Sequence, residues 1–91
     1  MSKYMVTYDL RKPGQNYDNL IAAIKSYGGW VKVSESSWFI RTNSTAAEVR
    51  DKLNAHTDSG DRLMVAGLSG EAAWRNCIAT NDELTNFFNN N

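Results

Sequence analysis

The sequence predicts an α+β sandwich in which two helices cover one face of a four-stranded antiparallel sheet. Runs with a period of two, which is typical of strands, alternate along the chain with stretches of helical spacing. The chain has 91 residues, enough for one small domain. We therefore assign residues 1–91 to a single domain, with a core over residues 3–68 and a variable tail over residues 69–91.

The first quarter of the chain predicts a strand followed by a helix. Tyr4–Leu10 is rich in residues that favour strands, and its alternate side chains from Tyr4 to Tyr8 share one face. A Pro-Gly turn within residues 11–15 ends this strand. Asn16 is placed to cap a helix that Gly28-Gly29 would end. The apolar stripe of this helix comprises Tyr17, Leu20, Ile21, Ile24 and Tyr27.

A hairpin and a second helix follow. Trp30–Val33 and Trp38–Thr42 read as two short strands joined by a serine-rich turn. Thr45 and Glu48 stand three residues apart, which is the spacing of a capping box. The predicted inner face of the second helix comprises Ala46, Val49, Leu53 and His56.

The end of the chain predicts a fourth strand and a short helical tail. Arg62–Leu68 reads as the fourth strand, residues 70–74 as a short helical turn, and Asn81–Phe88 as a last helix. Two β-α-β units joined by a hairpin give the ferredoxin-like order β-α-β-β-α-β. Both main helices then lie on one face of the sheet. The other face also carries apolar side chains, so we expect the tail or a second copy to cover it, and we predict a homodimer.

The composition of the chain limits the classes of function that we expect. Ten basic residues balance ten acidic ones, which disfavours strong non-specific binding to nucleic acid but leaves room for a local basic patch. Cys77 is the only cysteine, so no internal disulfide is expected, which favours a reducing cytoplasm. The sequence shows neither a signal peptide nor a membrane span, so we expect a cytoplasmic protein without membrane contact.

The order of these segments resembles a known superfamily. The run from Tyr4 to Leu10 resembles the opening strand of the second CRISPR-associated protein, the small adaptation subunit. The patterns Val6–Leu10, Lys12–Gln15, Ser37-Trp38 and Asp51–Leu53 are similar to small bacterial and phage proteins labelled SinR-like. Those proteins share a fold superfamily with the adaptation subunit and with the VapD-type toxin ribonucleases. The resemblance covers residues 3–68.

The resemblance implies a role for Asp9. In the adaptation-subunit family, the aspartate that ends the first strand lies near the dimer axis, where two copies can hold a divalent metal and cut phosphodiesters. Asp9 is the matching residue, so the resemblance implies a catalytic and metal-binding aspartate that uses Mg²⁺ or Mn²⁺ on RNA or DNA. The sequence departs from the family in three respects. Its net charge is zero, no extra strand is evident after Leu68, and the polar tail with Phe87 and Phe88 differs from the family's.

The residues alone leave simpler readings open. Asp9 also fits a turn aspartate that caps the following loop. Arg11 and Lys12 precede a helix and would hold a phosphate or another anion there, or else form a solvated loop. The alternative to a nuclease is therefore a dimeric binding module without chemistry, which holds a nucleotide-like anion or a protein partner.

The remaining reactive and aromatic residues favour structural roles. His56 is the only histidine, and no local signature supports a catalytic pair of Cys77 with His56. Aromatic side chains can stack on bases but more often build a core or a dimer face. They are Tyr4, Tyr8, Tyr27, Trp30, Trp38 and Trp74.

Overall fold

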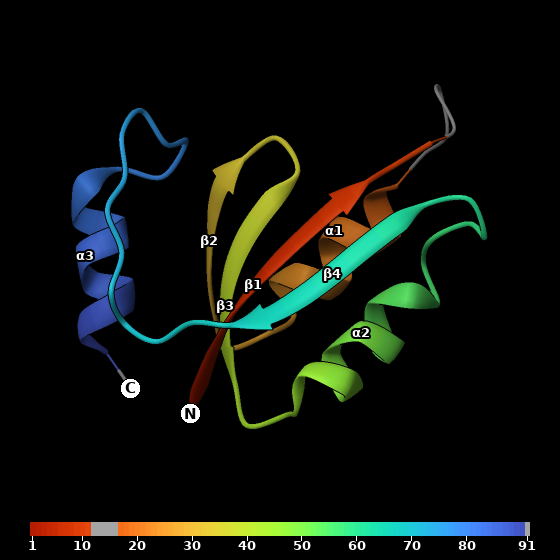
Figure 1. The fold of residues 1–91 in the computed structure, drawn as a ribbon, viewed down its shortest axis with the longest axis horizontal. Coiled ribbons are helices and arrows are strands. Elements are labelled where there is room, and N and C mark those ends of the chain that lie inside the picture. Colours follow the sequence, from red (N-terminus) through yellow and green to blue (C-terminus); the bar gives the residue numbers. More distant parts are fainter. Residues whose placement is uncertain (12–16, 91) are drawn as a thin grey trace.

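The chain folds around one antiparallel sheet of four strands in the order β2-β3-β1-β4 (Figure 1). The computed structural model describes residues 1–11 and 17–90. The strands are β1 (Ser2–Asp9), β2 (Gly29–Ser34), β3 (Ser37–Thr42) and β4 (Arg62–Gly67), and the helices are α1 (Asp18–Lys25), α2 (Ala46–Asn54) and α3 (Asn81–Asn89). The predicted ferredoxin-like α+β fold is confirmed.

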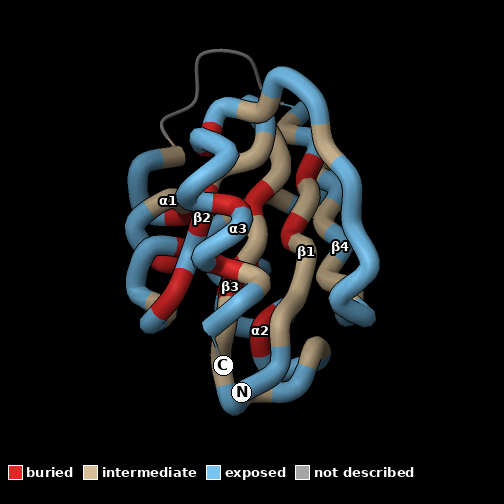
Figure 2. Tube along the Cα trace, turned by 90° about the vertical axis from the view of Figure 1, so that its left-hand side faces the viewer, coloured by how far each residue is buried: buried red, intermediate tan, exposed pale blue. Residues whose placement is uncertain are grey.

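The main core lies between the sheet and the pair of helices α1 and α2. Val6 and Tyr8 share one face of β1, as predicted, and this face turns toward the core, where the indole N–H of Trp38 donates a hydrogen bond of 3.0 Å to the Tyr8 hydroxyl. Figure 2 shows the buried positions gathered on the strands and on the inner sides of the helices. The buried members are Val6, Tyr8, Leu20, Ala23, Ile24, Trp38, Ile40, Val49 and Leu53.

Helix α1 ends earlier than predicted. It stops at Lys25, three residues before Gly28, and the Ser26 hydroxyl donates 2.6 Å to the Ala23 carbonyl oxygen. Because the serine takes up one of the last helical carbonyls, Tyr27 lies beyond the helix rather than on its stripe. The predicted cap Asn16 is outside the described residues, and Tyr17 stands at the N-cap position.

Helix α2 begins with the predicted capping box. The Thr45 hydroxyl accepts from the Glu48 amide at 3.2 Å, and the Glu48 carboxylate accepts from the Thr45 amide at 2.8 Å. The helix ends at Asn54, so His56 follows it and is exposed instead of lying on its inner face. Val49 and Leu53 are fully buried, as expected for that face.

The tail differs from the prediction before α3. Residues 70–74 form no helical turn, because Gly70 has a left-handed φ of 98° and the chain then runs without regular hydrogen bonds. Along this path the Trp74 ring stacks on the Phe88 ring. The two rings are nearly parallel, and their centroids are 6.1 Å apart. The predicted last helix is confirmed as α3, which opens with a second capping box at Thr80 and Glu83.

The tail covers half of the second face of the sheet. Leu84 and Phe87 of α3 are buried with Val31 of β2 in a second apolar cluster, and Phe39 of β3 packs against it. Figure 1 shows α3 beside β2, away from α1 and α2. The expectation that a tail covers this face therefore holds for the half formed by β2 and β3.

The half formed by β1 and β4 remains open. The register pairs Met5 with Ala66 and Thr7 with Met64 on this side of the sheet. Met64 is 60% exposed, so in the part of the chain that the structure describes this half faces solvent. None of the helices formed by the described residues has the length and apolar character that crossing a bilayer requires.

Candidate functional site

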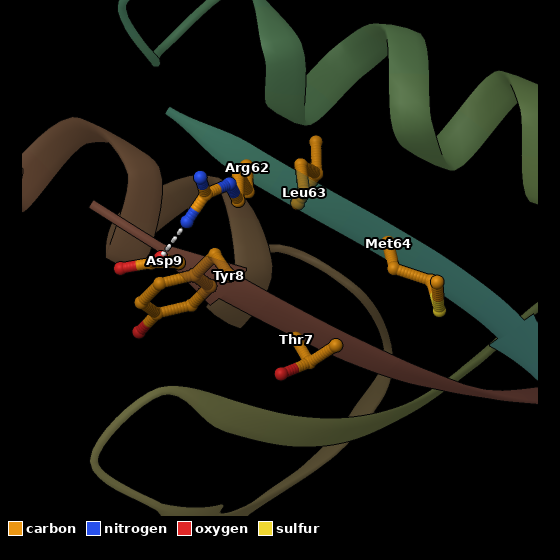
Figure 3. Close-up of a pocket in the computed structure, with 6 residues that line it drawn as sticks. All are labelled: Thr7, Tyr8, Asp9, Arg62, Leu63 and Met64. Carbon is orange, nitrogen blue, oxygen red and sulfur yellow. Dashed lines mark hydrogen bonds and ion pairs between the residues drawn. The ribbon is translucent and has the colours of Figure 1, made fainter. Parts of the chain in front are cut away.

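An arginine–aspartate cluster lies where β1 ends and β4 begins. The antiparallel register sets Asp9 directly opposite Arg62. Nη1 of Arg62 donates 2.8 Å to Oδ2 of Asp9, and Nη1 of Arg11 lies 3.4 Å from the same oxygen. In Figure 3 the side chains of Asp9 and Arg62 point toward one another from neighbouring strands. All three side chains are half exposed or more.

Asp61 holds the loop after β1 against the start of β4. Its Oδ1 accepts from the Arg11 backbone amide at 2.7 Å, and its Oδ2 accepts from the Tyr17 hydroxyl at 3.0 Å and from the Asp58 amide at 2.8 Å. One carboxylate therefore fixes the backbone of Arg11 relative to the strand that carries Arg62. This positions the two guanidinium groups toward the same point.

An open hollow of about 260 Å³ adjoins the cluster (Figure 3). Its lining residues are Thr7, Tyr8, Asp9, Arg62, Leu63 and Met64. This volume lies below the range of pockets that enclose a whole small molecule, which is roughly 300–1,000 Å³. The hollow suits a single group such as a phosphate, with the remainder of a ligand lying across the surface.

The donor set of one protomer does not fit a divalent metal. Magnesium and manganese prefer several oxygen ligands, usually more than one of them charged when the protein supplies the site. Among residues 1–11 and 17–90, no three His, Cys, Asp or Glu side chains gather into a metal-binding group. Asp9 instead accepts from two guanidinium groups, whose positive charge would repel a cation.

The structure brings together some of the predicted site residues and adds two others. Asp9 and Arg11 meet, whereas Lys12 lies outside the described residues. Sequence reasoning missed Arg62, although the first residue of the last strand falls opposite the end of the first strand in an antiparallel pair. It also missed Asp61, because an aspartate in a turn gives no local sign of a bond to a residue fifty positions away.

The other residues considered for function occupy structural positions. Trp38 is buried in the main core, and Cys77 packs against the second cluster. His56 is exposed after α2. Trp30 is the most exposed tryptophan at 41%, and the Lys25 ammonium lies 5.2 Å from its ring centroid.

Comparison with known proteins assigns no function to this site. No protein-family model matches this chain, and no solved structure matches it either. Fold and site together define an α+β domain that presents two arginines and one aspartate at the edge of an open sheet face. The particular function is therefore inferred from that geometry.

Proposed function

We propose that this protein is a homodimeric binding module that holds a phosphate-bearing, nucleotide-like ligand between Arg11 and Arg62. One observation carries the proposal: two guanidinium groups converge on a single carboxylate oxygen, at 3.4 and 2.8 Å, beside a hollow that suits one phosphate. The planar fork of arginine matches phosphate as well as carboxylate oxygens. In the free protein, Asp9 takes the place that the phosphate would take.

The charge balance is compatible with this role. The whole chain carries no net charge, so attraction comes from the local pair of arginines and not from an overall positive field. Asp9 competes with the ligand for both arginines. A phosphate therefore binds at the cost of two weak surface ion pairs, each of which contributes at most about 1 kcal/mol.

Metal-dependent cleavage of RNA or DNA through Asp9 is the second candidate. It is favoured by the position of Asp9. The Asp9 side chain is 54% exposed at the end of β1, one of the two strands that form the open half of the sheet. A second copy that met this half would bring a second Asp9, and two carboxylates would hold Mg²⁺ or Mn²⁺ better than one. Such an ion would supply charge stabilisation at the phosphate.

Asp9→Asn separates the two candidates. The binding module predicts that Asp9→Asn binds pyrophosphate at least as tightly as wild type, because a competing anion is gone. Arg62→Gln should bind it about ten-fold to a hundred-fold more weakly, the effect of losing a charge-assisted hydrogen bond. The nuclease predicts that wild type cuts labelled RNA or DNA with magnesium or manganese and that Asp9→Asn does not.

Arg50 and Asp51 provide the matched control. They form an exposed arginine–aspartate pair at 3.0 Å on α2, and neither residue lines the hollow beside Asp9. Arg50→Gln and Asp51→Asn should leave pyrophosphate binding, measured by calorimetric titration, unchanged. Equal affinity in wild type, Arg62→Gln and Arg50→Gln would contradict the binding proposal, and a monomeric mass in sedimentation would contradict the dimer.

A further inference from the structure

The two edges of the sheet are protected to very different degrees. The amides of Ile78 and Ala79 donate to the carbonyl oxygens of Val33 and Lys32 on β2, at 3.0 and 2.9 Å. The pairing of β2 with β3 also shifts register between Lys32 and Ser34. A bulge, a strand lysine and a covering segment are the devices by which proteins block pairing at a sheet edge. All three are present at β2.

Over residues 1–11 and 17–90, no further segment donates a backbone hydrogen bond to the outer side of β4, and the strand has neither a bulge nor a lysine. Arg62 to Gly67 pair with β1 without a register shift, and the strand contains neither proline nor lysine. Within the described residues β4 is the last strand of the sheet and pairs with β1 alone. Its middle residues Leu63, Met64 and Val65 favour strands, and its outer peptide groups face away from the sheet.

We propose that two copies of the chain join through this edge, with β4 pairing antiparallel to β4 of the partner subunit. The inference rests on the proposed dimer and specifies its interface. Arg62 is the only charged residue of β4 and stands at its first position. Antiparallel pairing places the two Arg62 side chains at opposite ends of the joint, whereas parallel pairing would set them side by side at an energetic cost.

Symmetry limits the possible registers, and the exposed Met64 is the residue we place at the axis. Directly opposed residues of antiparallel strands point to the same face, so a two-fold axis normal to the sheet requires one residue to face its own copy. With Met64 at the axis, Leu63 faces Val65 of the partner subunit on the helix side, and Arg62 faces Ala66 of the partner subunit. The exposed Met64 side chains then pack against each other on the open face.

This interface separates the two arginine–aspartate clusters. Asp9 lies two strands from the joint in each copy, opposite a residue two positions from the axis. With a rise of ~3.3 Å per residue and a strand spacing of ~4.8 Å, the two Asp9 residues are about 20 Å apart. The dimer would therefore carry two independent phosphate sites and no metal shared by both aspartates.

Charge substitution at Met64 tests the interface. Met64→Lys and Met64→Glu each place like charges opposite one another, so both variants should sediment as monomers where wild type is a dimer. Because Met64 is exposed in the single chain, both should keep the wild-type circular dichroism spectrum. Ile78→Lys is the matched control, since Ile78 is 52% exposed on the protected edge, and it should remain a dimer.

An equimolar mixture of the two Met64 variants is the decisive experiment. Opposite charges at the axis should restore a dimer, and the outward amides of β4 should regain protection from hydrogen exchange. If Met64→Lys still forms a dimer, or if the mixture stays monomeric, the β4 interface is wrong. Either result would still be compatible with a dimer formed through another surface. A monomeric wild type would overturn both the interface and the dimer, and pyrophosphate binding would still report on the site by itself.

Discussion

The backbone amide of Arg11 donates a 2.7 Å hydrogen bond to the carboxylate of Asp61, a residue fifty positions further along the chain. The bond ties the exit of β1 to the entrance of β4. Asp61 also accepts from the Tyr17 hydroxyl, so the start of α1 is held at the same point. The placement of Arg11 against Asp9 therefore depends on a side chain that does not belong to the arginine–aspartate cluster itself.

Replacing Asp61 with alanine should weaken both stability and ligand binding. The change removes the hydrogen bonds that the Asp61 carboxylate accepts from the Arg11 amide and the Tyr17 hydroxyl, and we expect a loss of about 1–3 kcal/mol in unfolding free energy. Pyrophosphate affinity should fall several-fold, because Arg11 loses its fixed backbone. Tyr17→Phe is the control: it removes one of these bonds and should reduce stability less, with affinity unchanged. An Asp61→Ala variant with wild-type affinity would show that Asp61 does not position the site.

Tyr8→Phe should destabilise the main core. The tyrosine hydroxyl accepts from the indole N–H of buried Trp38 at 3.0 Å, and phenylalanine keeps the ring but leaves that donor unpaired. The expected cost is about 1–3 kcal/mol, measured by urea unfolding. In a Trp38→Phe background the same change should cost clearly less, since the donor is already absent. Equal costs in the two backgrounds would mean that the bond contributes nothing.

Gly29→Ala should disturb Arg41, whereas Gly28→Ala should not. A Cβ at position 29 would lie 2.5 Å from Nη2 of Arg41, while nothing stands within 4 Å of one at position 28. Arg41 would have to leave its place over the Phe87 ring, 5.4 Å from the centroid, which costs about 1 kcal/mol. In an Arg41→Ala background the cost of Gly29→Ala should disappear. Thermal unfolding of wild type, the three single variants and the double variant checks both statements.

Stability should decline at alkaline pH partly through Tyr27. Burial raises the pKa of the Tyr27 phenol above its ordinary value of 10.0, so the folded state favours the neutral form. This contribution is complete below pH 10 and is lost as the pH rises through the raised pKa of the folded state. Tyr27→Phe should therefore lose less stability than wild type between neutral and strongly alkaline pH, as measured by urea unfolding. Parallel pH profiles for the two proteins would contradict the assignment.

The fold was predictable because its signals are local. Alternation from Tyr4 to Tyr8 correctly grouped the side chains that share one face of β1, and the Thr45–Glu48 spacing correctly placed the start of α2. The same spacing recurs at Thr80 and Glu83, where α3 begins. The failed prediction over residues 70–74 has a tertiary cause: Trp74 finds its partners, Phe88 and Asn81, in α3 and not in its own turn.

The site was only partly predictable because it depends on register. Asp9 and Arg11 stand close together in sequence and were identified there. Their partners Arg62 and Asp61 lie some fifty residues further along the chain, at the start of β4. A shift of the β1–β4 pairing by two residues would put Met64 in place of Arg62 without exchanging the faces of the sheet. Composition cannot fix such a register.

The segment over residues 78–79 also determines how far the sheet can grow. A sheet with two unpaired edges can add subunits indefinitely, because each added subunit presents another unpaired edge strand. Here Ile78 and Ala79 occupy the outer side of β2, so in the described part of each copy β4 is the edge that can pair with another strand. If copies of the chain join through β4 as proposed, assembly stops at two subunits, because the tail already occupies the outer side of β2 and prevents the growth of a fibre.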